Sequence, residues 1–261
     1  MSKNFENGII SSSDSGADFL AADIEITGDV HWVDSVNGDD SNDGSELKPL
    51  ASLTQAITNA TANNGDVIVI KSASTFTSAT SIALSKAGVR VFGLGTGSTK
   101  PTFTVSGNVD LLDLTAESVE INNLRFAAGS AAHTARVNVG AAGARIENCD
   151  FLCGANDLNS ITIPDAGDYC TIKGCTFTIT ADGPDNAIEV EAAAVLGLRV
   201  EGCTFDGGDH GFDEGGLYSA VAHLNHVYLE NTLTAASIVH TAAAKGICSG
   251  TIAGDGAYVR I

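Results

Sequence analysis

Apolar and polar residues alternate in short runs along most of this chain, and one such run recurs. Each copy alternates over four residues, continues with Asn or Gly, and ends on Phe three residues later. The copies begin at Val119, Ala144, Cys170 and Leu198, with an incomplete copy from Val89 and a frayed one from Val227. Alternation with a period of two predicts strands with one buried face. Copies spaced 25 to 30 residues apart predict stacked repeats.

The fifth position of each copy is where we expect the chain to bend. Asn and Gly tolerate a left-handed backbone, so this position joins two short strands at a sharp turn. The bend residues are Asn123, Asn148, Gly174, Gly202 and Asn231. Because the bends stack, we expect the side chains of Asn123, Asn148 and Asn231 to form a ladder of hydrogen bonds.

The first and the third residues after the bend are expected to point inward and to stack from coil to coil. One column holds Cys149, Cys175 and Cys203, and the other holds Phe126, Phe151, Phe177 and Phe205. A further strand is expected between copies, at 111–114, 135–139, 160–163, 187–190, 220–224 and 237–239. Three short strands in each turn then form three parallel sheets. A β-sandwich is the alternative, but it would leave the common register of Asn, Gly and Phe to coincidence.

The predicted fold is therefore all-β: a right-handed, single-stranded parallel β-helix with three short strands per coil, about seven coils, and an N-terminal capping helix. Residues 1–30 do not fit the repeat and are expected to form an N-terminal arm or anchor. Residues 31–64 contain a lead-in loop and the helix, within 50–63, which is expected to plug the open end of the coil. Residues 65–261 form the parallel β-helix.

The segment before the repeats adds a family resemblance. An Asp- and Gly-rich loop from Trp32 to Ser45 precedes the short helical run Ala51–Ile57, and an apolar strand follows at 65–70. With these residues the chain resembles the right-handed parallel β-helix, or pectate-lyase-like, superfamily, and within it the β-helix proteins of phage virions. The resemblance covers residues 31–261. It implies the fold but not an activity, because the superfamily holds lyases, hydrolases, epimerases and virus structural proteins.

The net charge of the chain limits the kinds of partner that it can bind. The chain has 13 basic and 32 acidic residues, for a net charge of −19. Such a surface repels nucleic acid and anionic membranes, so we expect neither as a partner. No apolar run is long enough to span a membrane. The N-terminus does not have the basic start and apolar block of a secretion signal, so the protein is expected to be made in a host cytoplasm and to act in a virion.

The charged residues bear on two kinds of catalytic chemistry, that of lyases and that of hydrolases. The basic residues do not gather, and Arg90, Glu120 and Arg145 alternate as on a solvated face, which disfavours a lyase. Hydrolases of this fold use paired carboxylates. The candidates are Asp209, His210 and Asp213 in the long acidic loop 206–216, and Glu189, which projects outward from the neighbouring sheet. The alternative is that acidic, Gly-rich residues are simply the usual material of β-helix turns.

Metal and thiol chemistry have weaker signals. Asp39, Ser41 and Asp43, followed by Gly44, resemble the start of a calcium loop, but the twelfth position is Leu50 rather than Glu. A solvated turn is favoured, no cofactor is expected, and structural calcium is left open. The six cysteines are interpreted as free thiols that pack as small apolar groups, since their spacing does not suit zinc.

These patterns together predict a structural virion protein of a tailed phage, either a capsid decoration or cement protein or a fibre component. It is expected to be a homotrimer that contacts other virion proteins through residues 1–30. Catalysis is disfavoured but left open. The alternatives are a tailspike-like glycan hydrolase that uses the loop carboxylates, and a non-catalytic module that binds a host-surface glycan.

Overall fold

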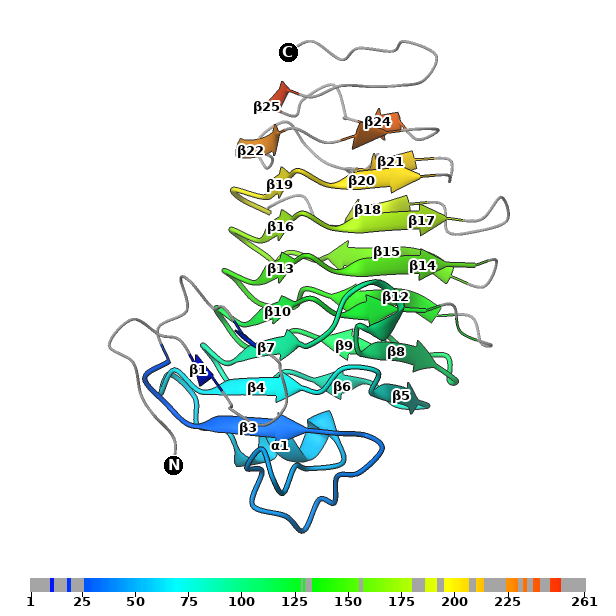
Figure 1. The fold of residues 1–261 in the computed structure, drawn as a ribbon. Helices are drawn as coiled ribbons and strands as arrows, with labels where there is room; N and C mark the ends of the chain where they lie inside the picture. Colours follow the sequence, from blue (N-terminus) through cyan, green and yellow to red (C-terminus); the bar gives the residue numbers. More distant parts are fainter. Residues whose placement is uncertain are drawn as a thin grey trace.

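The computed structural model describes residues 26–127, 129, 133–154, 157–179, 186–191 and 195–206, and the backbone of short strands elsewhere. Only the backbone is described for residues 133–134, 157–158, 179 and 186, and for all strands outside these ranges. The chain is mostly β and forms a parallel β-solenoid with three sheets (Figure 1). The predicted fold class, a parallel β-helix with three strands per coil, is confirmed.

Sheet 1 contains the first strand of each repeat. Its strands, in spatial order, are β3 (Val30–Val33), β4 (Val67–Ile70), β7 (Arg90–Gly93), β10 (Glu120–Asn122), β13 (Arg145–Glu147), β16 (Thr171–Lys173), β19 (Arg199–Glu201), β22 (Leu224–Leu229) and β25 (Lys245–Ser249). Each strand pairs in parallel with the equivalent strand of the next coil, so that Val91, Ile121 and Ile146 are successive register partners. The stacking follows directly from the repeat.

The other two sheets complete each turn. Sheet 2 contains β5 (Thr75–Ser78), β8 (Thr102–Val105), β11 (Arg125–Phe126), β14 (Asp150–Cys153), β17 (Thr176–Ile179), β20 (Thr204–Asp206) and β23 (Thr232–Leu233). Sheet 3 contains β6 (Ile82–Ala83), β9 (Leu112–Asp113), β12 (His133–Asn138), β15 (Asp157–Ile163), β18 (Asn186–Val190), β21 (His210–Asp213) and β24 (Ser237–Val239). A separate antiparallel pair, β1 (Ile10–Ser11) and β2 (Asp18–Phe19), belongs to none of the three sheets.

The predicted phenylalanine column is confirmed. Phe126, Phe151, Phe177 and Phe205 stack with successive ring centroids 4.8 Å apart and ring planes within 13° of one another. The column also continues backward to Phe103 and Phe76, which the repeat did not reveal. Each buried ring contributes about 1.5–3 kcal/mol of transfer free energy, and the common stacking fixes the register of sheet 2.

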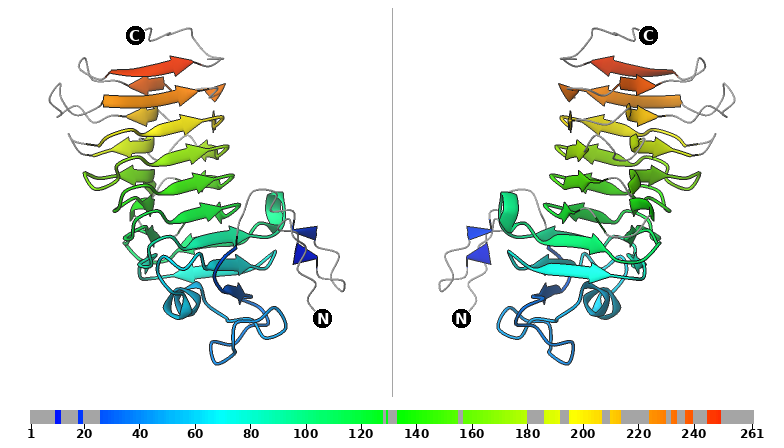
Figure 2. Two further views of the ribbon diagram at one scale, coloured as in Figure 1. Left: turned by 90° about the vertical axis from the view of Figure 1, so that its left-hand side faces the viewer. Right: turned by 90° about the vertical axis from the view of Figure 1, so that its right-hand side faces the viewer.

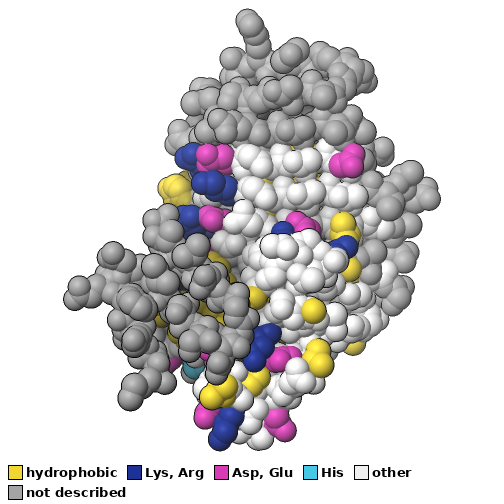
Figure 3. Space-filling view, viewed as in Figure 1, with side chains coloured by type: hydrophobic (Ala, Val, Ile, Leu, Met, Phe, Trp, Pro, Cys, Tyr) yellow, Lys and Arg dark blue, Asp and Glu magenta, His cyan; other side chains and the backbone are white. Residues whose placement is uncertain are grey.

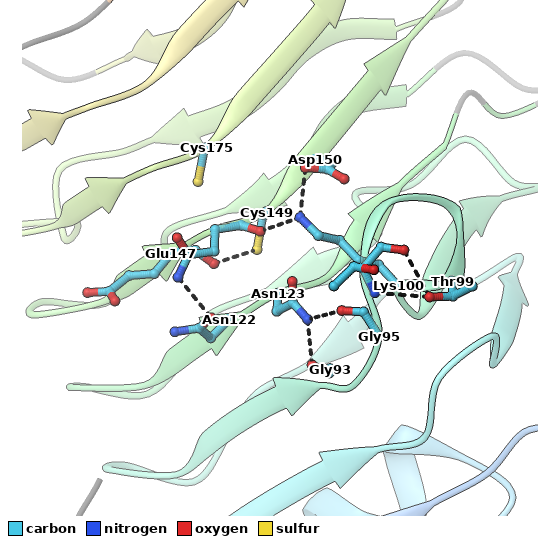
Figure 4. Close-up of polar contacts among 12 residues, drawn as sticks. Gly93, Gly95, Thr99, Lys100, Asn122, Asn123, Glu147, Cys149, Asp150 and Cys175 are labelled. Atoms are coloured by element: carbon cyan, nitrogen blue, oxygen red, sulfur yellow. Dashed lines mark hydrogen bonds and ion pairs between the residues drawn. The ribbon is translucent and has the colours of Figure 1, made fainter. Parts of the chain in front are cut away.

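The bends have the expected left-handed backbone, with φ of 57° at Asn123, 54° at Asn148 and 61° at Gly174 and Gly202. The ladder of Asn side chains takes a different form from the one predicted (Figure 4). Asn123 donates from Nδ2 to the carbonyl oxygens of Gly93 and Gly95, both at 2.8 Å, and Asn148 donates to Asn122 Oδ1 at 3.2 Å. The preceding coil has Gly93 where an Asn partner would stand, so its carbonyl accepts instead. Asn231 lies outside the described residues.

The cysteine column is buried in the same core. The Sγ–H groups of Cys149 and Cys175 donate to the carbonyl oxygens of Glu147 at 3.3 Å and of Lys173 at 3.5 Å. Among the described side chains, the free thiols are those of Cys149, Cys153, Cys170, Cys175 and Cys203, as predicted. Burial raises the pKa of Cys170 to about 12 and also raises that of Cys175. The thiols of Cys170 and Cys175 therefore stay neutral and unreactive near neutral pH.

Helix α1 spans Leu53–Asn59 and lies at the N-terminal end of the solenoid in Figure 1. It begins at Ser52, whose Oγ accepts a hydrogen bond from the Gln55 amide at 3.1 Å, a normal N-cap. Leu53, Ala56 and Ile57 are buried in the main core. That the helix seals the solenoid stays a prediction. The count of about seven coils does too, because it includes segments beyond Asp206 whose side chains lie outside the described residues.

None of the helices among the described residues is long and apolar enough to cross a membrane.

Candidate functional site

The candidate carboxylates fall on sheet 3. Strand β21 pairs in parallel with β18, and the register places Asp213 beside Glu189 and His210 beside Asn186. Neighbouring strands are about 4.8 Å apart, so the backbones of Glu189 and Asp213 are adjacent. The prediction that residues 206–216 form one loop is wrong for 210–213, which extend sheet 3 because Phe212 takes the register position of Ile188. Asp209 lies outside the described residues.

The Glu189 carboxylate is held by a residue that sequence reasoning missed. The Asn159 side chain, from β15, donates a hydrogen bond from Nδ2 to Glu189 Oε2. Asn159 is buried and Glu189 is half-buried. The register partner of Glu189 on β15 is Thr162, which is also buried. Nothing in the local sequence distinguishes Asn159, because the contact joins residues 30 positions apart.

The same register column continues through the earlier coils as a set of polar side chains. Asp113, Asn138, Thr162 and Glu189 are successive register partners on β9, β12, β15 and β18. Asn138 donates from Nδ2 to Asp113 Oδ1 at 3.1 Å, and Ser81 donates from Oγ to Asp113 Oδ2 at 2.6 Å. We call these four residues the polar column of sheet 3. Its acidic end is formed by Glu189 and the register position of Asp213.

A second set of charged side chains lies on sheet 1, on the strands that precede the bends. Arg145 pairs with Glu147, and Arg199 Nε lies 2.9 Å from Glu201 Oε2. Figure 3 shows Lys or Arg and Asp or Glu side chains alternating along the left edge, over β13, β16 and β19. The charges of this face are paired with one another rather than gathered around one point.

The prediction that this face is solvated agrees with its Arg side chains, since Arg145 is 53% and Arg199 is 47% exposed, but its carboxylates are more shielded. The side chain of Glu120 is only 14% exposed, and Arg145 Nε lies 4.0 Å from it. Burial raises the pKa of Glu120, and the neighbouring Glu147 raises it further, against the hydrogen bond from Asn122 and the charge of Arg145.

The residues of the calcium candidate are engaged in local turns. Asp39 Oδ1 accepts from the Ser41 amide at 2.8 Å and from Ser41 Oγ at 2.7 Å, and Asp43 Oδ1 accepts from the Ser45 amide at 3.0 Å. The hydrogen bonds from Ser41 and Ser45 lower the pKa of Asp39 and Asp43. Within the described side chains there is no group of three or more His, Cys, Asp or Glu arranged to hold a metal ion. Structural calcium at this turn stays a prediction.

Comparisons with known proteins give two distant structural similarities and no family. No protein-family model matches it, and no curated protein matches it. Among solved structures it is similar to a rhamnogalacturonan lyase, at 13% identity and a TM-score of 0.45, over 90% of each chain. It is also similar to the GH136 lacto-N-biosidase from Eubacterium ramulus, at 14% identity and a TM-score of 0.46, over 78% of this chain and 44% of that one. The chain thus spans less than half of the second structure.

Proposed function

We propose that this protein is a non-catalytic structural component of a tailed-phage virion, as a capsid decoration or cement protein or a fibre component. The observation that carries the proposal is that the charged side chains of the repeats pair with each other. Besides the pairs on sheet 1, Lys100 Nζ lies 2.8 Å from Asp150 Oδ1 on sheet 2. Such pairing favours a stiff rod whose charges serve its own structure and its solubility.

In this proposal the protein is a homotrimer attached to its neighbours through residues 1–30, and the solenoid projects from the particle. The net charge of −19 keeps the projecting rods soluble and apart from nucleic acid. The sequence resemblance to phage virion β-helix proteins supports the same location. The surface of the rod is then free to contact a host glycan without cleaving it.

The copy number of the chain in purified particles tests the proposal. Quantitative mass spectrometry against the major capsid protein is the measurement. Hundreds of copies are expected for a capsid decoration protein, and a few to a few dozen for a fibre or tail component. Absence of the chain from purified particles contradicts the virion proposal. Deletion of residues 1–30 is expected to remove the protein from particles, whereas retention contradicts the anchoring role.

A second candidate function is favoured by one specific observation, the register pairing of Glu189 with Asp213 beside the Asn159 hydrogen bond. In this alternative the two carboxylates act as acid and base, or as nucleophile and acid, on a neutral glycan. Polyanionic glycans are disfavoured by the charge of the chain.

The second candidate function is tested by incubating the protein with a panel of neutral glycans and measuring the new reducing ends that cleavage creates. Glu189→Gln and Asp213→Asn are expected to abolish cleavage while leaving the far-ultraviolet circular dichroism unchanged. Asp150→Asn is the matched control, because that carboxylate belongs to sheet 2 and pairs with Lys100. A wild-type protein that binds but does not cleave the panel supports the glycan-binding alternative. Cleavage that survives both substitutions contradicts the proposed pair.

A further inference from the structure

The outer side of sheet 1 carries a second apolar cluster at its N-terminal end. Val67, Val69 and Phe92 pack together there, with Ile26, Val30, Trp32 and Leu94 against them, and they are separate from the main core. The residues between them, Ile68, Ile70 and Val91, belong to the main core instead. Because successive side chains of a strand point to opposite sides, the cluster lies on the outside of the solenoid. We call it the outer apolar face.

The apolar character of this face is confined to the first three strands of sheet 1. Trp32, Val69 and Phe92 are successive register partners on β3, β4 and β7. The next members of the same column are Asn122, Glu147 and Lys173. The column therefore changes from apolar to polar where the solvent-facing repeats begin. Such a switch from apolar to polar residues is expected if another segment covers sheet 1 at the first coils and leaves it exposed to water at the later ones.

The central side chains of the face are fully covered. Val67 is 0% exposed, and Val69 and Phe92 are each 4% exposed, although they point away from the core. Trp32 and Val30 at its border are only partly buried. An apolar surface of this kind is stable only when another apolar group removes it from water.

The chain itself leads onto this face. Ile26 packs against the cluster and is held there by the residues that follow it. Thr27 Oγ1 donates to the Asn64 carbonyl at 3.2 Å, and the Asp29 amide donates to Asp66 Oδ1 at 2.8 Å. A Cβ at Gly28 would lie 2.1 Å from Asp66 Oδ1, so only Gly allows this close approach. Residues 1–25 therefore join the body of the protein at a fixed point on the outer apolar face.

We propose that the N-terminal arm, residues 1–25 of the same chain, docks on the outer apolar face through its last residues. The run from Phe19 to Ile26 alternates near its end, with Ile24 and Ile26 separated by Glu25 and preceded by Asp23. Ile24 then continues the contact of Ile26, and the two acids face water. The eight residues of this run, when extended, span seven steps and reach roughly 23 Å, whereas three neighbouring strands span only about 10 Å, so the run is long enough to cross the face.

The position of the β1–β2 pair agrees with this docking. Figure 2 draws the pair outside the solenoid and level with its first coils. The docked arm divides residues 1–30 into a part that belongs to the body and an upstream part, residues 1–18, that is left for partners. The inference goes beyond the proposed virion role and does not depend on it, because it concerns the purified chain alone.

Tryptophan fluorescence tests the docking directly, because Trp32 is the only tryptophan and lies at the border of the face. Deletion of residues 1–25 is expected to shift the emission to the red and to raise acrylamide quenching roughly twofold, since the indole loses its apolar cover. A synthetic peptide of residues 1–25 is expected to reverse both changes saturably. Unchanged emission and quenching in the folded deletion variant overturns the proposal.

A pair of point variants keeps the test valid if the deletion variant does not fold. Ile24→Asp is expected to expose Trp32, whereas Asp23→Asn, one residue earlier and on the opposite side of the run, is expected to leave its emission unchanged. Equal behaviour of the two variants contradicts the proposed register. Protection of Trp32 that weakens on dilution, together with a smaller mass in light scattering, would show that the arm of another copy covers the face and would overturn docking within one chain.

Discussion

Lys100 and Asp150, which are 50 residues apart in sequence, form an ion pair that joins the turn after β7 to strand β14. The Lys100 Nζ lies 2.8 Å from Asp150 Oδ1 and also donates to the carbonyl oxygen of Asn148 at 2.7 Å (Figure 4). Both side chains are largely shielded from water, so solvent screens this pair less than an exposed one.

Replacement of Lys100 by Met is therefore expected to lower the free energy of unfolding by about 1–2 kcal/mol, since it leaves the Asp150 carboxylate and the Asn148 carbonyl without this donor. Urea unfolding followed by circular dichroism measures the loss. Lys48→Met is the matched control, because Lys48 is exposed. A double-mutant cycle with Asp150→Asn isolates the pair, and a coupling energy near zero would contradict the role given to this bond.

The stacked phenylalanines make a prediction about the core. Phe151 lies between Phe126 and Phe177, with ring centroids 4.8 Å from each, and is fully buried. Phe151→Ala is expected to destabilise the protein by about 3–5 kcal/mol, because a ring-sized cavity opens inside a column that cannot close around it. Thermal unfolding measures the change. Leu152→Ala, on the next and outward-facing position, should cost much less, and equal costs would argue against the column as a main source of stability.

The fold could be predicted from the sequence because the repeat combines two independent signals, the period-two alternation and the Asn or Gly bend. The phenylalanine column could be followed only where the full phrase recurs, so Phe76 and Phe103, which precede the complete copies, were missed. The Gly- and Asp-rich sequence around strand β21 predicts a loop there. Its place in sheet 3 is set by pairing with β18, which is a non-local effect.

The candidate site was predictable in part for the same reason. Alternation and coil length bring Glu189 and Asp213 into adjacent register positions. The Asn159 contact to Glu189 joins neighbouring strands but is offset from their register pairs, and the Lys100 contact to Asp150 joins residues 50 positions apart. No local pattern specifies such contacts, because they depend on how the turns between sheets carry the chain.

Two bend glycines in equivalent positions provide a matched pair. Gly174 and Gly202 both have φ of 61°, but a Cβ at Gly174 would lie 2.8 Å from Asn148 Oδ1, whereas a Cβ at Gly202 would meet nothing within 4 Å. Gly202→Ala should cost about 1–2 kcal/mol for the left-handed backbone alone. Gly174→Ala should cost more, because the Asn148 side chain must also move and weaken its bond to Asn122. Chemical unfolding compares them, and a larger loss at Gly202 would contradict the steric argument.

The buried Asp66 predicts how stability depends on pH. Burial by itself raises the pKa of Asp66, but hydrogen bonds from the Thr61 and Asp29 amides and from Asn64 outweigh it, so the pKa is lowered from the ordinary 3.8. The carboxylate is 1% exposed, and these three donors each lie 2.8 Å from it. Because the folded pKa lies below the unfolded one, the contribution to stability is complete above pH 3.8 and is lost as the pH falls through the folded value.

Asp66→Asn is therefore expected to lower the free energy of unfolding by about 2 kcal/mol at pH 7, because a charged acceptor of three hydrogen bonds is replaced by a neutral amide. The difference between wild type and variant should shrink as the pH falls below 3.8, where the wild-type carboxyl also becomes protonated. Thermal melting from pH 7 to pH 2 measures both effects. Asp165→Asn, at an exposed position, serves as the control. A difference that stays constant down to pH 2 would mean that Asp66 acts through its shape rather than its charge.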